Sequence, residues 1–137
     1  MTIKIGINGF GRIGRNVLRA AWEDPAVEFV HINDLTSAEM LAYLLENDSV
    51  HRRWKSVKAV EGGLSIDGRF IAVSAEKEPG KVPWGAAGVD VVLECTGLFV
   101  EGPKCQPHLD AGAKKVIISA PGKNIDGTFV CGVNDHL

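Results

Sequence analysis

Apolar residues along this chain repeat with two different spacings, and the two spacings alternate. Short apolar runs typical of β-strands occupy residues 3–8, 27–32, 89–94 and 115–119. Helical spacing separates the early runs, first in Ile13, Val17, Leu18 and Ala21 and then in Met40, Leu41, Leu44 and Leu45. A near-continuous apolar run such as 89–94 is typical of a buried parallel strand. The pattern therefore predicts an α/β fold with a doubly wound, mostly parallel sheet.

Four further stretches complete the expected elements. Residues 57–75 hold short alternating runs separated by glycine-containing turns, which predict a small antiparallel excursion. Residues 103–111 predict a weaker helix, and residues 128–133 predict a last strand. The polar stretch 47–54, with its basic side chains, is expected to be a solvated loop.

Residues 9–14 read Gly-Phe-Gly-Arg-Ile-Gly, the pattern G-x-G-x-x-G. The motif follows a predicted strand and opens a predicted helix, which is the context of a dinucleotide-binding, Rossmann-type turn. Bare glycine backbone lets a ligand approach closely, and the free N–H groups of the helix start favour a pyrophosphate. The alternative interpretation is that the glycines serve only tight packing.

Asp34 directly follows the second predicted strand, about 20 residues beyond the last glycine, where an acidic side chain accepts from both hydroxyls of an adenosine ribose. A carboxylate there repels a 2′-phosphate, so the sequence favours NAD over NADP. The alternative roles for Asp34 are those of a turn former or a helix cap.

Small and polar residues follow two later strands, Cys95-Thr96-Gly97 after one and Ser119-Ala120-Pro121-Gly122 after the other. Ligands of open α/β sheets bind outside the carboxyl ends of the strands, so both corners are candidates for a nucleotide cleft. A simple strand-to-loop turn is the alternative at the first corner.

Composition narrows the class of protein. The chain has 137 residues, which suits one domain, and 45% of them are hydrophobic. A net charge of −2 argues against a nucleic-acid binder that works through bulk charge. No apolar run approaches a membrane span, and no secretory signal pattern is present. Three widely spaced cysteines without a C-x-x-C pair favour a reducing cytoplasm over a disulfide framework or a metal site.

A catalytic centre is not recognisable among the cysteines and histidines. Cys95 and Cys131 are expected in the core because they adjoin apolar strands. Cys105 lies near a helix start, where a thiolate could be stabilised, but no histidine clearly pairs with it. The sequence therefore predicts a cofactor platform without catalytic residues.

The stretch Ile7-Asn8-Gly9-Phe10-Gly11-Arg12-Ile13-Gly14-Arg15 closely resembles the opening signature of phosphorylating glyceraldehyde-3-phosphate dehydrogenases. Further segments resemble that family in order and at family spacing. They are Ile32-Asn33-Asp34, Asp48-Ser49-Val50-His51, Pro83-Trp84-Gly85, Cys95-Thr96-Gly97-Leu98-Phe99, residues 111–121 and Gly132-Val133-Asn134. The resemblance covers essentially the whole chain.

The resemblance implies an NAD-dependent reaction, in which a cysteine thiolate adds to an aldehyde, hydride passes to the nicotinamide and phosphate releases an acyl phosphate. It implies backbone contacts of Arg12 and Ile13 to the pyrophosphate, and places Lys77 beside the adenine and Ser119 toward the nicotinamide. The expected cofactor site comprises Asn8, Gly9, Phe10, Gly11, Arg12, Ile13, Asn33, Asp34, Lys77, Cys95, Thr96, Gly97, Phe99 and Ser119.

Departures from the family pattern limit the expected activity. The nucleophile motif Ser-Cys-Thr-Thr-Asn of the family would follow Gly132-Val133-Asn134, and none of the three cysteines matches it. Arg52-Arg53-Trp54 and the stretch 100–107 also differ from the usual pattern. We therefore expect residues 1–137 to be an NAD-binding domain without its catalytic domain, able to bind NAD but not to turn over.

The expected partners are that catalytic domain or the other subunits of the family homotetramer. Two alternatives stay open: a non-catalytic nucleotide-binding or interaction module, and a fragment of an erythrose-4-phosphate dehydrogenase.

Overall fold

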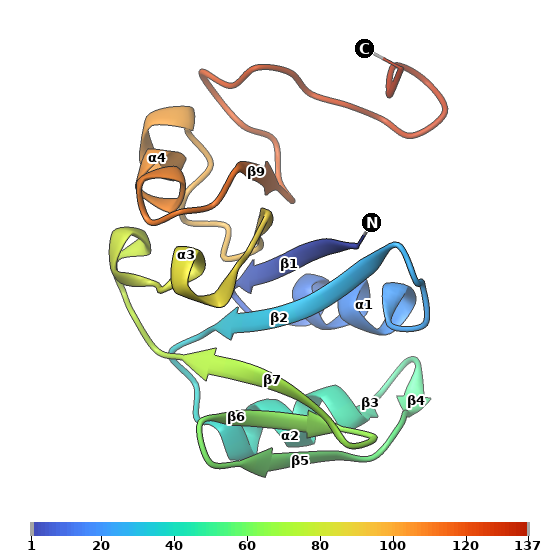
Figure 1. Ribbon diagram of the computed structural model, residues 1–137. Helices are drawn as coiled ribbons and strands as arrows, with labels where there is room; N and C mark the ends of the chain where they lie inside the picture. The colour runs from blue at the N-terminus through green and yellow to red at the C-terminus, as the bar shows by residue number, and fades with distance from the viewer. Residues whose placement is uncertain (1, 137) are drawn as a thin grey trace.

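The computed structural model describes residues 2–136 and contains a seven-stranded sheet in the order β5-β6-β7-β2-β1-β8-β9 (Figure 1). Its parallel part consists of β1 (Ile3–Asn8), β2 (Val27–Asn33), β7 (Arg69–Ser74), β8 (Val91–Glu94) and β9 (Lys115–Ile118). At one edge β5 (Val57–Val60) and β6 (Gly63–Ile66) add to β7 in antiparallel fashion. The predicted Rossmann-type sheet and its antiparallel excursion are both confirmed.

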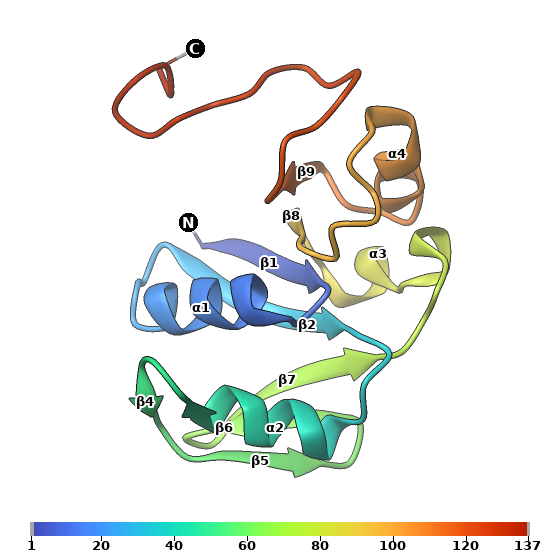
Figure 2. The same cartoon turned by 180° about the vertical axis from the view of Figure 1, so that it is seen from behind.

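Helices cover both faces of this sheet. Figure 2 shows α1 (Arg12–Ala21) and α2 (Ala38–Glu46) in front of one face, while Figure 1 shows α3 (Trp84–Ala87) over the other. The short 3-10 helix η1 (Pro79–Lys81) leads into α3, and α4 (Gly102–Asp110) packs against η1. Each face has its own apolar core, as a doubly wound sheet requires.

Strand β1 shows how the alternation of side chains serves the two cores. Ile5 and Ile7 point into the core under α1 and α2. Gly6 faces the opposite way, where a Cβ atom would lie 2.5 Å from the Trp84 ring. The absence of a side chain at Gly6 therefore lets the large indole pack directly on the strand.

Two apolar residues expected on packed helix faces lie at the surface: Ile13 is 53% exposed and Met40 is 49% exposed. At the start of α1 the contact with β1 is made by Gly14, whose Cβ would lie only 2.6 Å from the Gly9 carbonyl oxygen. This close approach turns Ile13 outward. In α2 the buried stripe runs through Leu41 and Leu45, which leaves Met40 beside it.

The predicted strand 128–133 is wrong. The chain leaves β9 as an extended, exposed segment and forms turns at residues 131–136 (Figure 1). The Asn134 side chain accepts from the Val130 N–H at 2.7 Å and donates to the Thr128 carbonyl at 2.9 Å, so backbone groups are satisfied locally. Cys131, expected in the core, is exposed for the same reason.

The expected solvated loop 47–54 is exposed at residues 49–53 and contains a small hairpin of β3 (Asn47–Asp48) and β4 (Arg52–Arg53), which the sequence did not predict. The hairpin is followed by Trp54, which packs edge-on against Trp22 at a centroid distance of 6.1 Å. The Arg19 guanidinium lies over the Trp54 ring. These contacts join the hairpin to α1.

Candidate cofactor site

Three parallel strands bring their last residues into line at one edge of the sheet. Asn8 of β1 lies in register with Asn33 of β2 on one side and with Glu94 of β8 on the other. The chain leaves β1 toward β2 and later returns to β8 on the opposite side of β1, which creates a topological switch point. Such a point is where open α/β sheets bind their ligands.

The glycine turn after β1 follows this edge closely. Gly9 has φ of +90°, and a Cβ there would lie 2.7 Å from the Thr96 backbone nitrogen. Hence the glycine turn and the corner that follows β8 touch each other. A Cβ at Gly11 would meet no atom within 4 Å, so the outer side of the turn is open. The structure thus combines the packing role of the glycines with an accessible backbone.

Helix α1 begins without a cap from its own side chains. Its N-cap residue is Gly11, no side chain caps the helix, and no acidic residue lies in the first turn. The first N–H groups of any helix have no partner within it, and they carry the positive end of its dipole. Arg12 adds a positive side chain in the same turn. These residues fit a diphosphate group.

The Asp34 carboxylate is half-buried and already oriented by two backbone donors. One oxygen accepts from the Phe10 N–H at 2.7 Å, and the other accepts from the Thr36 N–H at 2.9 Å. The second bond is the turn-forming role that the sequence left open. An ionised carboxylate has about four acceptor positions, so both oxygens keep capacity for a diol. The ribose contact stays a prediction.

Asn33 and Asn8 belong to the expected cofactor site, but their side chains are buried inside the protein. The Asn33 amide donates to the Glu76 carbonyl at 2.9 Å, and its oxygen accepts from the Glu76 N–H at 2.9 Å. This pairing holds the loop after β7 beside β2. The loop carries Lys77, which is exposed at the same edge as Asp34.

The corner after β8 is shaped by Thr96. Its N–H donates to a Glu94 carboxylate oxygen at 2.9 Å, and its hydroxyl donates to the same oxygen at 2.6 Å. The hydroxyl also accepts from the Leu98 N–H at 3.0 Å, and Gly97 adopts a φ of +76°. The resulting tight turn presents Thr96 and Gly97 beside the glycine turn. Phe99 follows, half-buried.

Neither Cys95, which is half-buried, nor Cys105, which is buried, is activated as a nucleophile. Burial raises the pKa of the Cys95 thiol, while the Ser119 hydroxyl acts to lower it. Burial and the nearby Glu94 charge raise the pKa of Cys105, whose thiol donates to the Phe99 carbonyl at 3.2 Å. Both groups are therefore thiols at neutral pH.

Sequence reasoning did not assign a role to Asp48, although it lies in one of the segments that carry the family resemblance. Its two carboxylate oxygens meet the two terminal nitrogens of Arg12, each at 3.1 Å. Backbone N–H groups of His51 and Val50, together with Arg12, lower the pKa of Asp48 to about 2. Asp48 thus fixes the Arg12 guanidinium near the start of α1.

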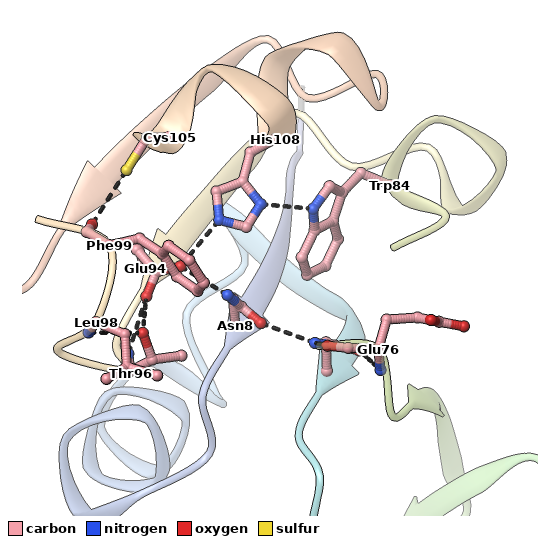
Figure 3. Close-up of polar contacts among 10 residues, drawn as sticks. Asn8, Glu76, Trp84, Glu94, Thr96, Leu98, Phe99, Cys105 and His108 are labelled. Carbon is pink, nitrogen blue, oxygen red and sulfur yellow. Dashed lines mark hydrogen bonds and ion pairs between the residues drawn. The ribbon is translucent and has the colours of Figure 1, made fainter. Parts of the chain in front are cut away.

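Sequence reasoning also missed a buried polar chain that begins at Glu94 (Figure 3). Glu94 accepts from Asn8 at 2.6 Å and contacts a ring nitrogen of His108 at 2.9 Å. The other ring nitrogen of His108 accepts from the Trp84 indole at 2.9 Å. A lone acidic residue at the end of an apolar strand was the available signal, because such a charge must find donors when the strand is buried.

Two negative observations apply to residues 2–136. No group of three or more His, Cys, Asp or Glu side chains in this range is arranged to hold a metal ion. No helix in it has the length and apolar character needed to cross a lipid bilayer.

Known proteins resemble this chain over most of its length. The family model for "Glyceraldehyde 3-phosphate dehydrogenase, NAD binding domain" matches residues 3–102. Glyceraldehyde-3-phosphate dehydrogenase 1 of Bacillus subtilis (strain 168) is 54% identical over 136 residues, covering 98% of this chain and 41% of its own. The enzyme of Geobacillus stearothermophilus is 55% identical over 135 residues, covering 98% of this chain and 40% of its own.

The chain thus spans about two fifths of the length of these relatives, 41% and 40%. The matched residues contain the glycine turn, Asp34 and the corner after β8, so the family match and the site geometry concern the same part of the molecule. The cofactor is NAD, and this chain belongs to the glyceraldehyde-3-phosphate dehydrogenase family through its NAD-binding domain.

Proposed function

We propose that this chain is the NAD-binding part of a phosphorylating glyceraldehyde-3-phosphate dehydrogenase. The proposed reaction oxidises an aldehyde, transfers hydride to NAD and uses phosphate to form an acyl phosphate. One observation carries the proposal: the Asp34 carboxylate is oriented by the Phe10 N–H at the edge where α1 starts uncapped. A diol-binding carboxylate beside a diphosphate-binding helix start suits a dinucleotide.

Bound NAD supplies the hydride acceptor, and the chain supplies its binding surface. The first N–H groups of α1, including those of Arg12 and Ile13, would bind the diphosphate, while the Arg12 guanidinium is already paired with Asp48. Asp34 accepts from the ribose hydroxyls and excludes a 2′-phosphate by repulsion. Lys77 lies toward the adenine end, while Thr96 and Gly97 line the far side of the glycine turn.

The catalytic nucleophile is proposed to come from outside these 137 residues. Cys95 and Cys105 are protonated thiols with raised pKa values, and Cys131 lies on an exposed turn. The 137-residue polypeptide is therefore proposed to bind NAD without oxidising an aldehyde. Its partners would be a catalytic domain and the other subunits of a homotetramer, in the cytoplasm.

A second candidate is a non-catalytic nucleotide-binding or interaction module. The observation that favours it is the apolar surface of the last segment, where Ile117 is 57%, Phe129 56% and Val133 70% exposed. Exposed apolar patches often mark protein contacts. Because the first candidate also assembles with other subunits, self-association through this surface would favour an interaction module only in a chain that binds no NAD. A monomer that persists on dilution would contradict the interaction module.

The proposed function is tested by calorimetric titration of the 137-residue chain with NAD and with NADP. We expect NAD to bind and NADP to bind at least about tenfold more weakly, because the Asp34 carboxylate repels the 2′-phosphate; tenfold corresponds to about 1.4 kcal/mol. Equal affinities would contradict the role of Asp34.

Absorbance of NADH is then followed with glyceraldehyde 3-phosphate and, separately, with erythrose 4-phosphate. No rise is expected with either aldehyde. A rise that depends on aldehyde and phosphate would contradict the claim that the nucleophile lies elsewhere. The aldehyde that gives the faster rise would then identify the substrate.

A further inference from the structure

We propose that Trp84 and His108 are positioning residues for the cofactor cleft, and that they act through the buried carboxylate of Glu94. The inference rests on the proposed function, because Thr96 and Gly97 are assigned to the NAD cleft there. Figure 3 shows the side chains of Trp84 and His108 directed in line toward Glu94. Neither Trp84 nor His108 belongs to the expected cofactor contacts, so their proposed role is to hold other residues in position.

The hydrogen bonds determine the tautomer of His108. The indole nitrogen of Trp84 can only donate, so Nδ1 of His108 must accept at 2.9 Å. The single ring proton is then on Nε2, which donates to Glu94 at 2.9 Å. His108 is 0% and Glu94 is 1% exposed, so water does not compete with this bond. Trp84 thereby aims one neutral imidazole donor at one carboxylate oxygen.

The two oxygens of Glu94 divide their hydrogen bonds between the two loops of the cleft. Oε1 accepts from the Asn8 amide, which directly precedes the glycine turn, and from His108. Oε2 accepts from the Thr96 N–H and hydroxyl in the opposite corner. Glu94 therefore ties together two loops that already touch between Gly9 and Thr96.

His108 is needed to hold the plane of this carboxylate. Burial works to raise the pKa of Glu94, but donors from His108, Thr96 and Asn8 outweigh it and leave the pKa below its ordinary value. Without the imidazole donor, Oε1 keeps only the Asn8 amide, and the carboxylate can rotate about its last bond. The corner at Thr96 is then no longer held at a fixed position relative to the glycine turn.

The test compares His108→Leu with His108→Gln in the 137-residue chain. His108→Leu removes the donor, and we expect NAD affinity to fall about tenfold, because binding must then reorder the Thr96 corner, at a cost no larger than that of one hydrogen bond to a charged group. His108→Gln keeps an N–H donor on a side chain of similar reach, and we expect its affinity within about threefold of wild type. The Thr96 amide proton resonance should move in His108→Leu and return toward its wild-type position in His108→Gln.

Leu64→Ala is the matched control, because Leu64 is fully buried in the core on the other face of the sheet. We expect a lower melting temperature with unchanged NAD affinity and an unchanged Thr96 resonance. Should His108→Leu fail to fold, Trp84→Phe replaces it. That variant removes the indole donor, so NAD affinity should fall about threefold, as for a neutral hydrogen bond.

Several outcomes would overturn the positioning role. They are unchanged NAD affinity in the folded variant that lacks its donor, an affinity of His108→Gln as low as that of His108→Leu, and an equal loss of affinity in Leu64→Ala. A wild-type chain that binds no NAD would overturn the proposed function before any variant is compared, and this inference with it.

Discussion

Asp48 and Glu94 are two carboxylates that each accept several hydrogen bonds, yet their donors lie at very different distances along the chain. Asp48 takes backbone donors two and three residues away, from Val50 and His51. Glu94 takes donors from Thr96, from His108 and from Asn8, the last being 86 residues away in sequence. The backbone donors of Asp48 form a local turn, to which Arg12 adds two donors from 36 residues away, whereas the Glu94 site exists only in the folded sheet.

The two carboxylates are similarly covered, since the side chain of Asp48 is 4% and that of Glu94 is 1% exposed, but their partners differ. The partner of Asp48 is Arg12, whose side chain is 45% exposed, so solvent screens that ion pair. Glu94 and His108 are buried, so an unpaired group there would have no water to replace its partner. Asp48 thus holds a partly exposed arginine at the start of α1, whereas Glu94 links the residue before the glycine turn to the corner after β8. We therefore expect substitutions of these carboxylates to differ in the size of their effects.

The largest effect is expected for Glu94→Ala. The change leaves the buried donors of Asn8 and His108 without an acceptor. Each unsatisfied neutral donor costs about 1–3 kcal/mol, so the free energy of unfolding should fall by roughly 2–6 kcal/mol. Urea denaturation monitored by tryptophan fluorescence measures the loss. Glu94→Gln keeps the shape and one acceptor oxygen, so it should lose less. If Glu94→Ala lowers the free energy of unfolding by less than about 1 kcal/mol, Glu94 contributes no more than an exposed ion pair does, and the prediction is wrong.

An intermediate effect is expected for Asp34→Ala, because Asp34 accepts one bond from its own turn and one from the glycine turn. Losing the ribose bonds should weaken NAD binding by on the order of 1–3 kcal/mol in calorimetry. Asp34→Asn is the matched control: it keeps an acceptor oxygen without the charge, and should bind NADP relatively better. Equal NAD affinity in wild type and Asp34→Ala would refute the ribose contact.

The smallest effect is expected for Asp48→Asn, and it should depend on pH. The folded-state pKa of Asp48 lies near 2, below its ordinary value of 3.8. A lowered folded-state pKa stabilises the protein above the unfolded value, and that stabilisation disappears as the pH falls from about 4 toward 2. Asp48→Asn should therefore have a lower urea midpoint than wild type at pH 7.

The difference between the two midpoints should shrink as the pH is lowered through this window. Asp126→Asn, at an exposed position in the last segment, is the control and should change the midpoint little. A gap between wild type and Asp48→Asn that stays constant from pH 7 down to pH 2.5 would contradict the assigned pKa. Such a result would also mean that the proposed difference between Asp48 and Glu94 is wrong.

Much of the fold could be read from the sequence because its signals are local. The strand of Ile5 and Ile7, the glycine turn and the helix through Leu18 follow one another without a gap, and each spacing predicts its element. The antiparallel excursion was predictable because Gly62 and Gly68 mark its turns. The position of Asp34 at the end of β2 followed in the same way.

The prediction failed where the outcome depended on partners elsewhere in the chain. Residues 128–133 are mostly apolar or β-branched, like a strand, but a strand exists only when a neighbouring strand receives its hydrogen bonds. Here the Val130 N–H donates to the Asn134 side chain and the Val133 N–H donates to the Val130 carbonyl, so both are satisfied locally. Met40 follows helical spacing, but the direction of the core decides which stripe of α2 is buried.

The sequence by itself determined the strands and helices from β1 to α2 and the antiparallel excursion, the glycine turn and the acidic residue that favours NAD, because each depends on neighbours within one element. Only the tertiary structure decided that Glu94 meets Asn8 and His108, and that Trp84 aims the imidazole. A buried carboxylate is stable only when donors surround it, and these donors come from separate strands and helices. Their meeting point is set by the packing of the sheet, which no local pattern encodes.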